Sequence, residues 1–142
     1  MDLHQIDWNK VPWENVRAGV DRKAFSSNGA TVALNRLAPG HEPRPHHHPH
    51  EQIIYILEGR FRIHVGEQQT VLGAGGLLVV PPDVEHWGEV VGDETVLNLD
   101  VFTPKRADYA AEWPGGLSTC PATDPGRDRL RVRQSLTMPR LS

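Results

Sequence analysis

Residues 40–59 read GHEPRPHHHPHEQIIYILEG and contain five of the eight histidines in the chain. His46 and His48 are two positions apart, so in an extended chain their side chains project to the same face. Gln52 has the same parity after the bend at Pro49, and an apolar run from Ile53 to Leu57 follows it. Imidazole nitrogens and an amide oxygen form a neutral donor set that suits Zn, Ni, Fe(II), Mn or Co. The stretch therefore predicts one divalent transition metal at the beginning of an apolar strand.

The sequence around this stretch alternates between short strand-like runs and turn residues. Turn signals recur about every 8–12 residues without a convincing helical period, which is typical of an all-β sandwich or barrel. The predicted strands are Thr31–Leu37, Gln52–Leu57, Arg60–Val65, Gln68–Leu72, Leu77–Val80, Glu85–Val91 and Thr95–Phe102.

The C-terminal part of the chain has a different composition. One helical turn is predicted around Ala107–Glu112, and from Pro114 onward Pro, Gly, Ser, Thr and Arg dominate. The segment Leu130–Arg133 alternates between apolar and basic residues. Two interpretations stay open for this segment: an edge strand, added to this chain or to a partner subunit, and a mobile tail.

Composition and charge exclude several classes of protein. The chain has 142 residues and a net charge of −3, and residues 1–113 hold 10 Lys and Arg against 16 Asp and Glu. An acidic body argues against nucleic acid as the main partner. The longest apolar run, Ile53 to Leu57, is far shorter than the roughly 20 residues of a membrane span. A single cysteine and an N-terminus without secretory features lead us to expect a cytoplasmic protein with no membrane partner.

Two segments together resemble the paired motifs of the cupin superfamily. The first is residues 40–59, with Gly40, His46, His48, Gln52 and Gly59 as anchors, and the second is GGLLVVPPDVEH at residues 75–86. The resemblance implies a double-stranded β-helix, or cupin jelly roll, with a metal near the mouth of the barrel. It also implies that His46, His48, Gln52 and His86 are the metal ligands, and that the protein is a homodimer.

The resemblance also gives a division of the chain. Residues 1–29 are expected to form an N-terminal arm and the first strands, residues 30–106 the cupin barrel, and residues 107–142 a C-terminal helical turn and extension.

One of the four expected ligands departs from the common cupin pattern. Most cupins carry Glu where this chain has Gln52, and the adjacent Glu51 faces the opposite side of a strand. Replacing a carboxylate by an amide removes one negative charge from the metal, which makes it a stronger Lewis acid toward a carbonyl or an enolate. The substitution therefore favours acid–base chemistry over redox chemistry.

A second layer of site residues is predicted in the last strand. Asn98, Asp100 and Phe102 share one face of that strand, and an inward carboxylate is costly unless it meets a metal, a cation or a substrate. Asp100 and Phe102, followed by Arg106, resemble the small cupins of the KdgF type, which act on unsaturated uronates. The resemblance implies that Asp100 is a general acid and base and that Arg106 anchors an anion. Phe102, Asn98 and Tyr55 are expected to contact the substrate.

Arg106 has an alternative role that the sequence leaves open, a salt bridge to Asp108 or to the C-terminal tail. The expected function is a lyase, isomerase or cyclase reaction on a small oxygen-rich carbonyl or hydroxy-acid molecule. A uronate is the best example of such a substrate and a polyketide the next. The alternatives are an Fe(II)-dependent dioxygenase and a non-catalytic cupin that binds a ligand through its metal.

Overall fold

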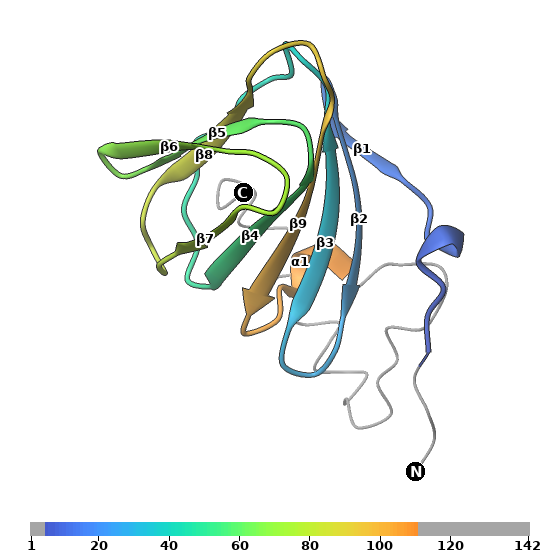
Figure 1. Ribbon diagram of the computed structural model, residues 1–142. Coiled ribbons are helices and arrows are strands. Elements are labelled where there is room, and N and C mark those ends of the chain that lie inside the picture. The colour runs from blue at the N-terminus through green and yellow to red at the C-terminus, as the bar shows by residue number, and fades with distance from the viewer. Residues whose placement is uncertain (1–4, 111–142) are drawn as a thin grey trace.

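The computed structural model describes residues 5–110, which form two antiparallel β-sheets that face each other (Figure 1). The larger sheet has the strand order β1 (Glu14–Arg17), β2 (Val20–Ser26), β3 (Thr31–Leu37), β9 (Val96–Thr103), β4 (Glu51–Glu58) and β7 (Leu77–Val80). The smaller sheet has the order β6 (Gln68–Leu72), β5 (Phe61–Val65) and β8 (His86–Val90). This arrangement confirms the all-β jelly roll.

Two short helical segments lie outside the sheets. A 3₁₀ turn, η1 (Trp8–Lys10), precedes β1, and α1 (Ala107–Ala110) follows β9 and lies against β2 and β3. None of the helices in the described part of the chain has the length and apolar character needed to cross a membrane.

The register of the larger sheet aligns its inward-facing residues in rows. Arg22 of β2 pairs with Asn35 of β3, which pairs with Asn98 of β9. Two rows further along the inner face, Phe102 of β9 pairs with Gln52 of β4. Since paired residues share a face of the sheet, these polar and aromatic side chains all project into the barrel.

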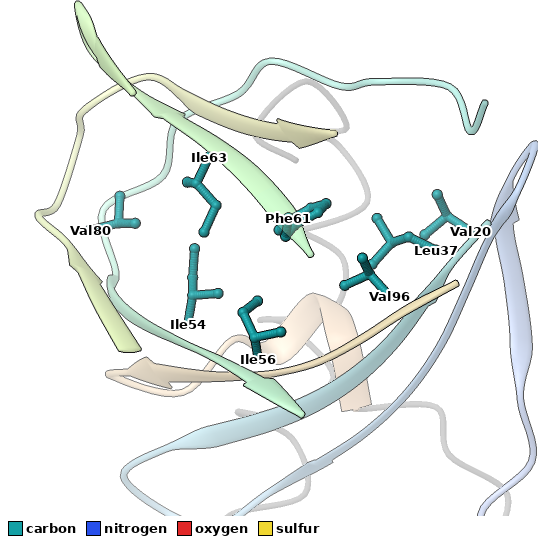
Figure 2. Packing of buried hydrophobic residues seen from close by; sticks show 8 residues of the cluster. All are labelled: Val20, Leu37, Ile54, Ile56, Phe61, Ile63, Val80 and Val96. Atoms are coloured by element: carbon teal, nitrogen blue, oxygen red, sulfur yellow. The ribbon is translucent and has the colours of Figure 1, made fainter. Parts of the chain in front are cut away.

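The apolar core occupies the rest of the barrel interior. Figure 2 shows its members, which come from both sheets: Val20, Leu37, Ile54, Ile56, Phe61, Ile63, Val80 and Val96. All of these side chains are less than 9% exposed, and burying one of this size contributes about 1.5–3 kcal/mol. Phe61 lies directly on Gly88, where a Cβ atom would stand 2.2 Å from the Phe61 ring. The two sheets are therefore held together mainly by aliphatic packing.

The predicted strands are confirmed to within one residue at each end. The sheet also reaches further toward the N-terminus than the predicted barrel range of 30–106, because β2 pairs with β3 along its whole length and β1 pairs with β2. The predicted helical turn is present as α1 over its first four residues. The predictions for residues 111–142, including the edge strand at 130–133, lie outside the described residues.

The N-terminal arm covers the outer face of its own sheet. The ring of Trp13 lies 4.6 Å from Lys23 Nζ and 4.1 Å from the Arg36 guanidinium, and Lys23 Nζ donates a hydrogen bond to the Trp8 carbonyl at 3.0 Å. Cations over indole faces are favourable contacts. The arm thereby fixes the outer side of β2 and β3, whose inner side lines the site described next.

Candidate metal centre and pocket

Three histidines from two separate segments meet at one end of the barrel. His46 and His48 lie in the segment before β4, and His86 begins β8. His46 and His86 exchange two backbone hydrogen bonds of 3.1 and 2.9 Å, which brings the two segments together. One nitrogen from each of the three rings lies within 4.8 Å of the others. The structure thus gathers the three histidines predicted as ligands.

Hydrogen bonds to the backbone orient all three rings in the same way. The Nδ1 atoms of His46, His48 and His86 lie 2.6, 3.1 and 2.8 Å from the carbonyl oxygens of Arg44, His50 and Val84. A carbonyl oxygen only accepts, so we assign the proton of each ring to Nδ1, which leaves Nε2 with an exposed lone pair.

Burial keeps these rings neutral. It lowers the pKa of His46 to about 3 and the pKa of His48 to about 4, and it lowers the pKa of His86 as well. A neutral imidazole is the form of histidine that binds metal ions.

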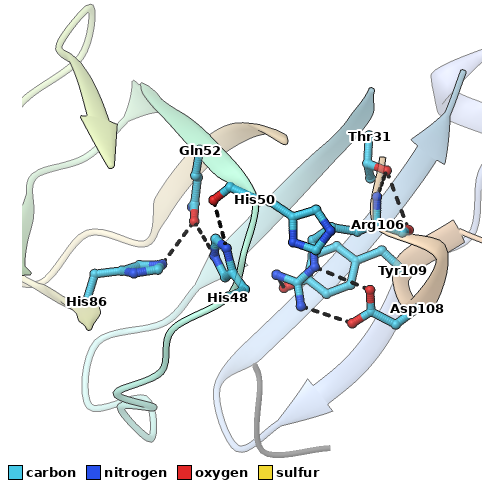
Figure 3. Close-up of polar contacts among 8 residues, drawn as sticks. All are labelled: Thr31, His48, His50, Gln52, His86, Arg106, Asp108 and Tyr109. Atoms are coloured by element: carbon cyan, nitrogen blue, oxygen red, sulfur yellow. Dashed lines mark hydrogen bonds and ion pairs between the residues drawn. The ribbon is translucent and has the colours of Figure 1, made fainter. Parts of the chain in front are cut away.

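Gln52 faces the histidines with its amide oxygen. Its Oε1 atom lies 3.1 Å from His48 Nε2 and 3.0 Å from His86 Nε2 (Figure 3). Gln52 also acts on Asp100, where it lowers the pKa of the carboxyl group. Since a carboxylate only accepts hydrogen bonds, the amide NH2 group is the side of Gln52 that suits Asp100, which agrees with the oxygen facing the histidines.

The resulting contacts place acceptors against acceptors. Neutral rings with protonated Nδ1 atoms offer only lone pairs toward the Gln52 oxygen, so the short Nε2–Oε1 distances are repulsive unless a cation lies among these atoms. Three imidazole nitrogens and an amide oxygen are donors that suit a divalent transition metal. His46, His48, Gln52 and His86 therefore fit such a metal, and they are the residues that would hold it.

Asp100 lies beside this centre as a buried carboxyl group. Its side chain is 8% exposed, and its two oxygens accept hydrogen bonds of 2.8 Å from Asn35 Nδ2 and Asn98 Nδ2. Burial raises the pKa of Asp100 to about 6, and hydrogen bonds from Gln52 and Asn35 oppose this rise. The carboxyl group can therefore exist in both protonation states near neutral pH.

The metal centre and Asp100 share one pocket. Gln52, His46, His86, Asn98, Asp100 and Phe102 all line it. Phe102 is 1% exposed, and its ring meets the rings of His48 and Tyr109 edge-on at centroid distances of 5.5 and 5.3 Å. The predicted site residues Asn98, Asp100 and Phe102 thus line the same cavity as three of the four predicted ligands, His46, Gln52 and His86.

Arg106 is not among the residues that line this pocket, and its predicted role as the anchor of a substrate anion stays a prediction. Its guanidinium is 1% exposed and binds Asp108 through two contacts, Nε–Oδ1 at 3.3 Å and Nη2–Oδ2 at 2.9 Å (Figure 3). It also donates to the Tyr109 hydroxyl at 3.0 Å and lies 3.8 Å from the centre of the Tyr109 ring. The alternative role, a salt bridge to Asp108, is the one found.

Tyr55 is also absent from the pocket. It follows Gln52 by three positions on β4, so its side chain lies on the opposite face of the strand from Gln52, Ile54 and Ile56. The structure thus places Tyr55 outside the pocket, and its contact with the substrate stays a prediction.

Sequence reasoning did not single out several polar and aromatic residues of the pocket wall. Asn35 holds Asp100, and the others include Arg17, Arg22, Arg44 and Tyr109. A usable signal existed for Arg22 and Asn35, since each alternates with residues that are buried in the core, Val20 and Leu37. For Arg17 and Arg44 the sequence contains no such pattern, because they lie at a strand end and in a connecting segment.

Comparisons with known proteins agree with this fold. The family model described as a cupin domain matches residues 33–102. The pectin degradation protein KdgF of Dickeya dadantii is 30% identical over 103 residues, which cover 71% of this chain and 93% of that protein. The polyketide synthase protein CurC of Streptomyces cyaneus is 27% identical over 109 residues, which cover 74% of this chain and 71% of that protein.

Solved structures show the same architecture. An RmlC-like cupin from Shewanella frigidimarina superposes with a TM-score of 0.69 at 27% identity, covering 77% of this chain and 97% of that one. KdgF from a Halomonas species superposes with a TM-score of 0.65 at 24% identity, covering 72% and 95%. By sequence and by structure, this chain is a member of the cupin family.

Proposed function

We propose that this protein is a metal-dependent enzyme that moves protons on a small oxygen-rich substrate, a carbonyl compound or a hydroxy acid. The observation that carries the proposal is Asp100, a buried carboxyl group that lines the same pocket as the histidine centre. A proton-transfer group of this kind works best when its pKa lies near the operating pH. The reaction class that fits is a lyase, isomerase or cyclase reaction.

The roles of the chain's own residues follow from their positions. When bound, the metal supplies a Lewis acid that polarises a substrate oxygen. Asp100 takes up and returns the proton, while Asn35 and Asn98 hold its two oxygens from the side of the sheet. Phe102 forms an apolar wall and excludes water from the neighbourhood of Asp100.

Gln52 gives this centre its particular character. Its oxygen faces the histidines and its amide group binds Asp100, so one side chain joins the metal ligands to the proton-transfer group. A glutamate at this place would set a second carboxylate against Asp100, and like charges at such proximity disfavour ionisation. The amide therefore allows Asp100 to ionise next to the ligand set.

The relatives favour two kinds of substrate within this class. KdgF is described as a protein of pectin degradation and CurC as a polyketide synthase protein. Pectin is built from uronic acids, and the three arginines of the pocket suit a carboxylate. We therefore place a uronate-like acid first and a polyketide second. The homodimer and the cytoplasmic location stay predictions.

The test is the variant Asp100→Asn, with Asp93→Asn as the matched control at an exposed turn. Turnover of an unsaturated uronate by the metal-loaded protein, followed as loss of ultraviolet absorbance, is expected to fall about 10²–10⁴-fold in Asp100→Asn. The metal content of both variants, measured by elemental analysis, is expected to match that of the wild type. Undiminished turnover with metal retained would show that Asp100 has no such role.

Oxygen uptake separates the dioxygenase alternative from this proposal. The proposed reaction consumes no oxygen, so an oxygen electrode is expected to give the same trace with and without substrate. Iron in the purified protein together with substrate-dependent oxygen consumption would replace the lyase or isomerase proposal by the dioxygenase.

A further inference from the structure

Three arginines line the outer part of the pocket. Arg17 ends β1, Arg22 lies on β2, and Arg44 lies between β3 and β4. All three are partly exposed, with the Arg44 side chain 42% exposed, whereas Gln52 and Asp100 deeper in the pocket are buried. We call Arg17, Arg22 and Arg44 the rim arginines.

The rim arginines have little negative charge to bind within the described residues. Asp100 is the only acidic residue among those that line the pocket, and both of its oxygens already bind asparagines. Arg17 donates from Nε to the backbone carbonyl of Glu42 at 2.8 Å, and this carbonyl has no net charge to balance the guanidinium. Arg44 lies 3.6 Å from the Glu42 carboxylate, and both side chains are well exposed, so this pair contributes little.

Arg22 is held by an aromatic ring instead of an acid. Its guanidinium carbon lies 3.7 Å from the centre of the Tyr109 ring, and no carboxylate in residues 5–110 is within ion-pair distance of it. Stacking on a ring leaves the edge of a guanidinium, where its N–H groups lie, able to donate. The Tyr109 ring is fixed in turn by Arg106 on its other side, at 3.8 Å.

The rim arginines also act on one another. Burial lowers the pKa of Arg17, and the positive charges of Arg44 and Arg22 lower it further. Like charges are thus gathered at one place in the pocket, and a bound anion would relieve their repulsion.

The position of the rim arginines relative to the proton-transfer group is set by the sheet. Arg22 pairs with Asn35 across β2 and β3, and Asn35 donates to Asp100. Arg44 is two residues before His46 and accepts the His46 Nδ1 hydrogen bond through its carbonyl oxygen. An anion held by the rim arginines would therefore lie beside both Asp100 and the histidine centre, in the same pocket.

The geometry points to an anion-binding subsite formed by Arg17, Arg22 and Arg44, which holds a carboxylate of the substrate while its reacting carbon atoms lie next to Asp100. This inference rests on the proposed function and deepens it, because it names the residues that select a carboxylic acid. Guanidinium groups bind carboxylates through paired, charge-assisted hydrogen bonds, which makes arginine suited to this task.

The experiment compares two ligands that differ only in this charge, D-galacturonate and its methyl ester. Binding to the full-length, metal-loaded Asp100→Asn protein is measured by calorimetry, so that turnover does not interfere. In that background, Arg22→Gln and Arg44→Gln are each expected to weaken binding of the acid by about tenfold or more and to change binding of the ester by less than about twofold. Arg62→Gln, on the outer face of β5, is the matched control and is expected to leave both unchanged.

Lysine variants keep the test decisive where a glutamine variant fails to fold. Arg22→Lys and Arg44→Lys retain the charge and lose the paired geometry, so an intermediate loss for the acid is expected. Equal binding of acid and ester by the parent protein, no detectable binding of the acid, or unchanged binding by the rim variants would each overturn the subsite.

The proposed function can fail separately from the subsite. Full turnover by Asp100→Asn together with arginine-dependent binding of the acid would remove the role of Asp100 and leave the subsite in place.

Discussion

The inward-facing positions of the barrel change character along single strands, and the two ends of the interior differ as a result. On β9 the inward residues run from Val96 through Asn98 to Asp100, and on β4 they run from Gln52 through Ile54 to Ile56. Because the two strands are antiparallel, Gln52 pairs with the inward Phe102, while Asp100 pairs with Ile54 and Asn98 with Ile56. Polar side chains therefore extend from the Gln52 end over three pairs, and the inward residue of β9 beyond them is the apolar Val96. The same alternation thus produces a core and a site within one barrel.

The two ends contribute differently to stability. Each apolar side chain of the core contributes about 1.5–3 kcal/mol when it is buried. A buried polar group is costly unless it is hydrogen-bonded, and even then its net contribution is about 1 kcal/mol. Asp100 accepts hydrogen bonds from Asn35 and Asn98 and interacts with Gln52, so its buried oxygens are not left unpaired. We therefore expect the polar residues to contribute less to the free energy of unfolding than the apolar core does.

The largest effect on stability is expected in the apolar end. Ile63 is 1% exposed within the core cluster, and Ile63→Ala removes three carbon atoms from a closely packed place. The free energy of unfolding of the metal-free protein is expected to fall by about 2–5 kcal/mol in urea denaturation. Ile63 also lines the pocket, but the variant removes none of the proposed ligands, so metal content per folded molecule should not change.

Ile53→Ala is the matched control, since Ile53 is 37% exposed on the outer face of β4. Its loss is expected to be about 1 kcal/mol or less. Equal losses for the two variants would contradict the assignment of the core to the inside of the barrel.

Substituting a histidine of the metal centre is expected to lower metal affinity strongly and the free energy of unfolding only slightly. His48→Ala removes a proposed ligand, and metal affinity should fall at least about 100-fold, since removing even a hydrogen-bond partner of a ligand costs about 10–100-fold. The metal-free protein should lose only about 1–2 kcal/mol of unfolding free energy. Competition with a chelator and urea denaturation measure the two quantities.

The exposed neighbour provides the control, because His47→Ala changes the same residue type one position away. It is expected to leave metal affinity within about twofold of the wild type, as an exposed substitution has little effect on a buried centre. Unchanged affinity in His48→Ala would remove His48 from the ligand set.

Much of the division of the barrel interior into a core and a site can be predicted from the sequence, because alternation and turns are local properties of the chain. The spacing of His46, His48 and Gln52 needs only strand parity to bring three ligands together. His86 could be added only through the family resemblance, since nothing local shows which two segments exchange backbone hydrogen bonds. Residues 1–29 were expected to hold an arm and the first strands, but the bounds of β1 and β2 could not be given, since their residues give a weak alternation signal.

The features of the site that the sequence leaves undetermined have a common physical origin. The role of Arg106 depends on whether Asp108 and Tyr109 reach its guanidinium, which is settled by the turn into α1 and not by residue types. The rim arginines come from β1, β2 and a connecting segment, so only the folded sheet places them in one pocket. Charges that are far apart in sequence are therefore the least predictable part of the site.

Tyr55 offers the smallest expected effect and a direct test of strand parity. Its side chain lies on the outer side of β4, away from Gln52, so Tyr55→Phe removes a hydroxyl group that the pocket does not contain. Turnover is expected to stay within about twofold of the wild type, and the free energy of unfolding within about 0.5 kcal/mol.

Phe102→Leu is the comparison, because Phe102 points inward and its ring meets those of His48 and Tyr109. A tenfold loss of turnover in Tyr55→Phe, with Phe102→Leu unaffected, would mean that the inner and outer faces of β4 had been exchanged. That result would undo the division of the barrel into a core and a site, since both depend on the same register.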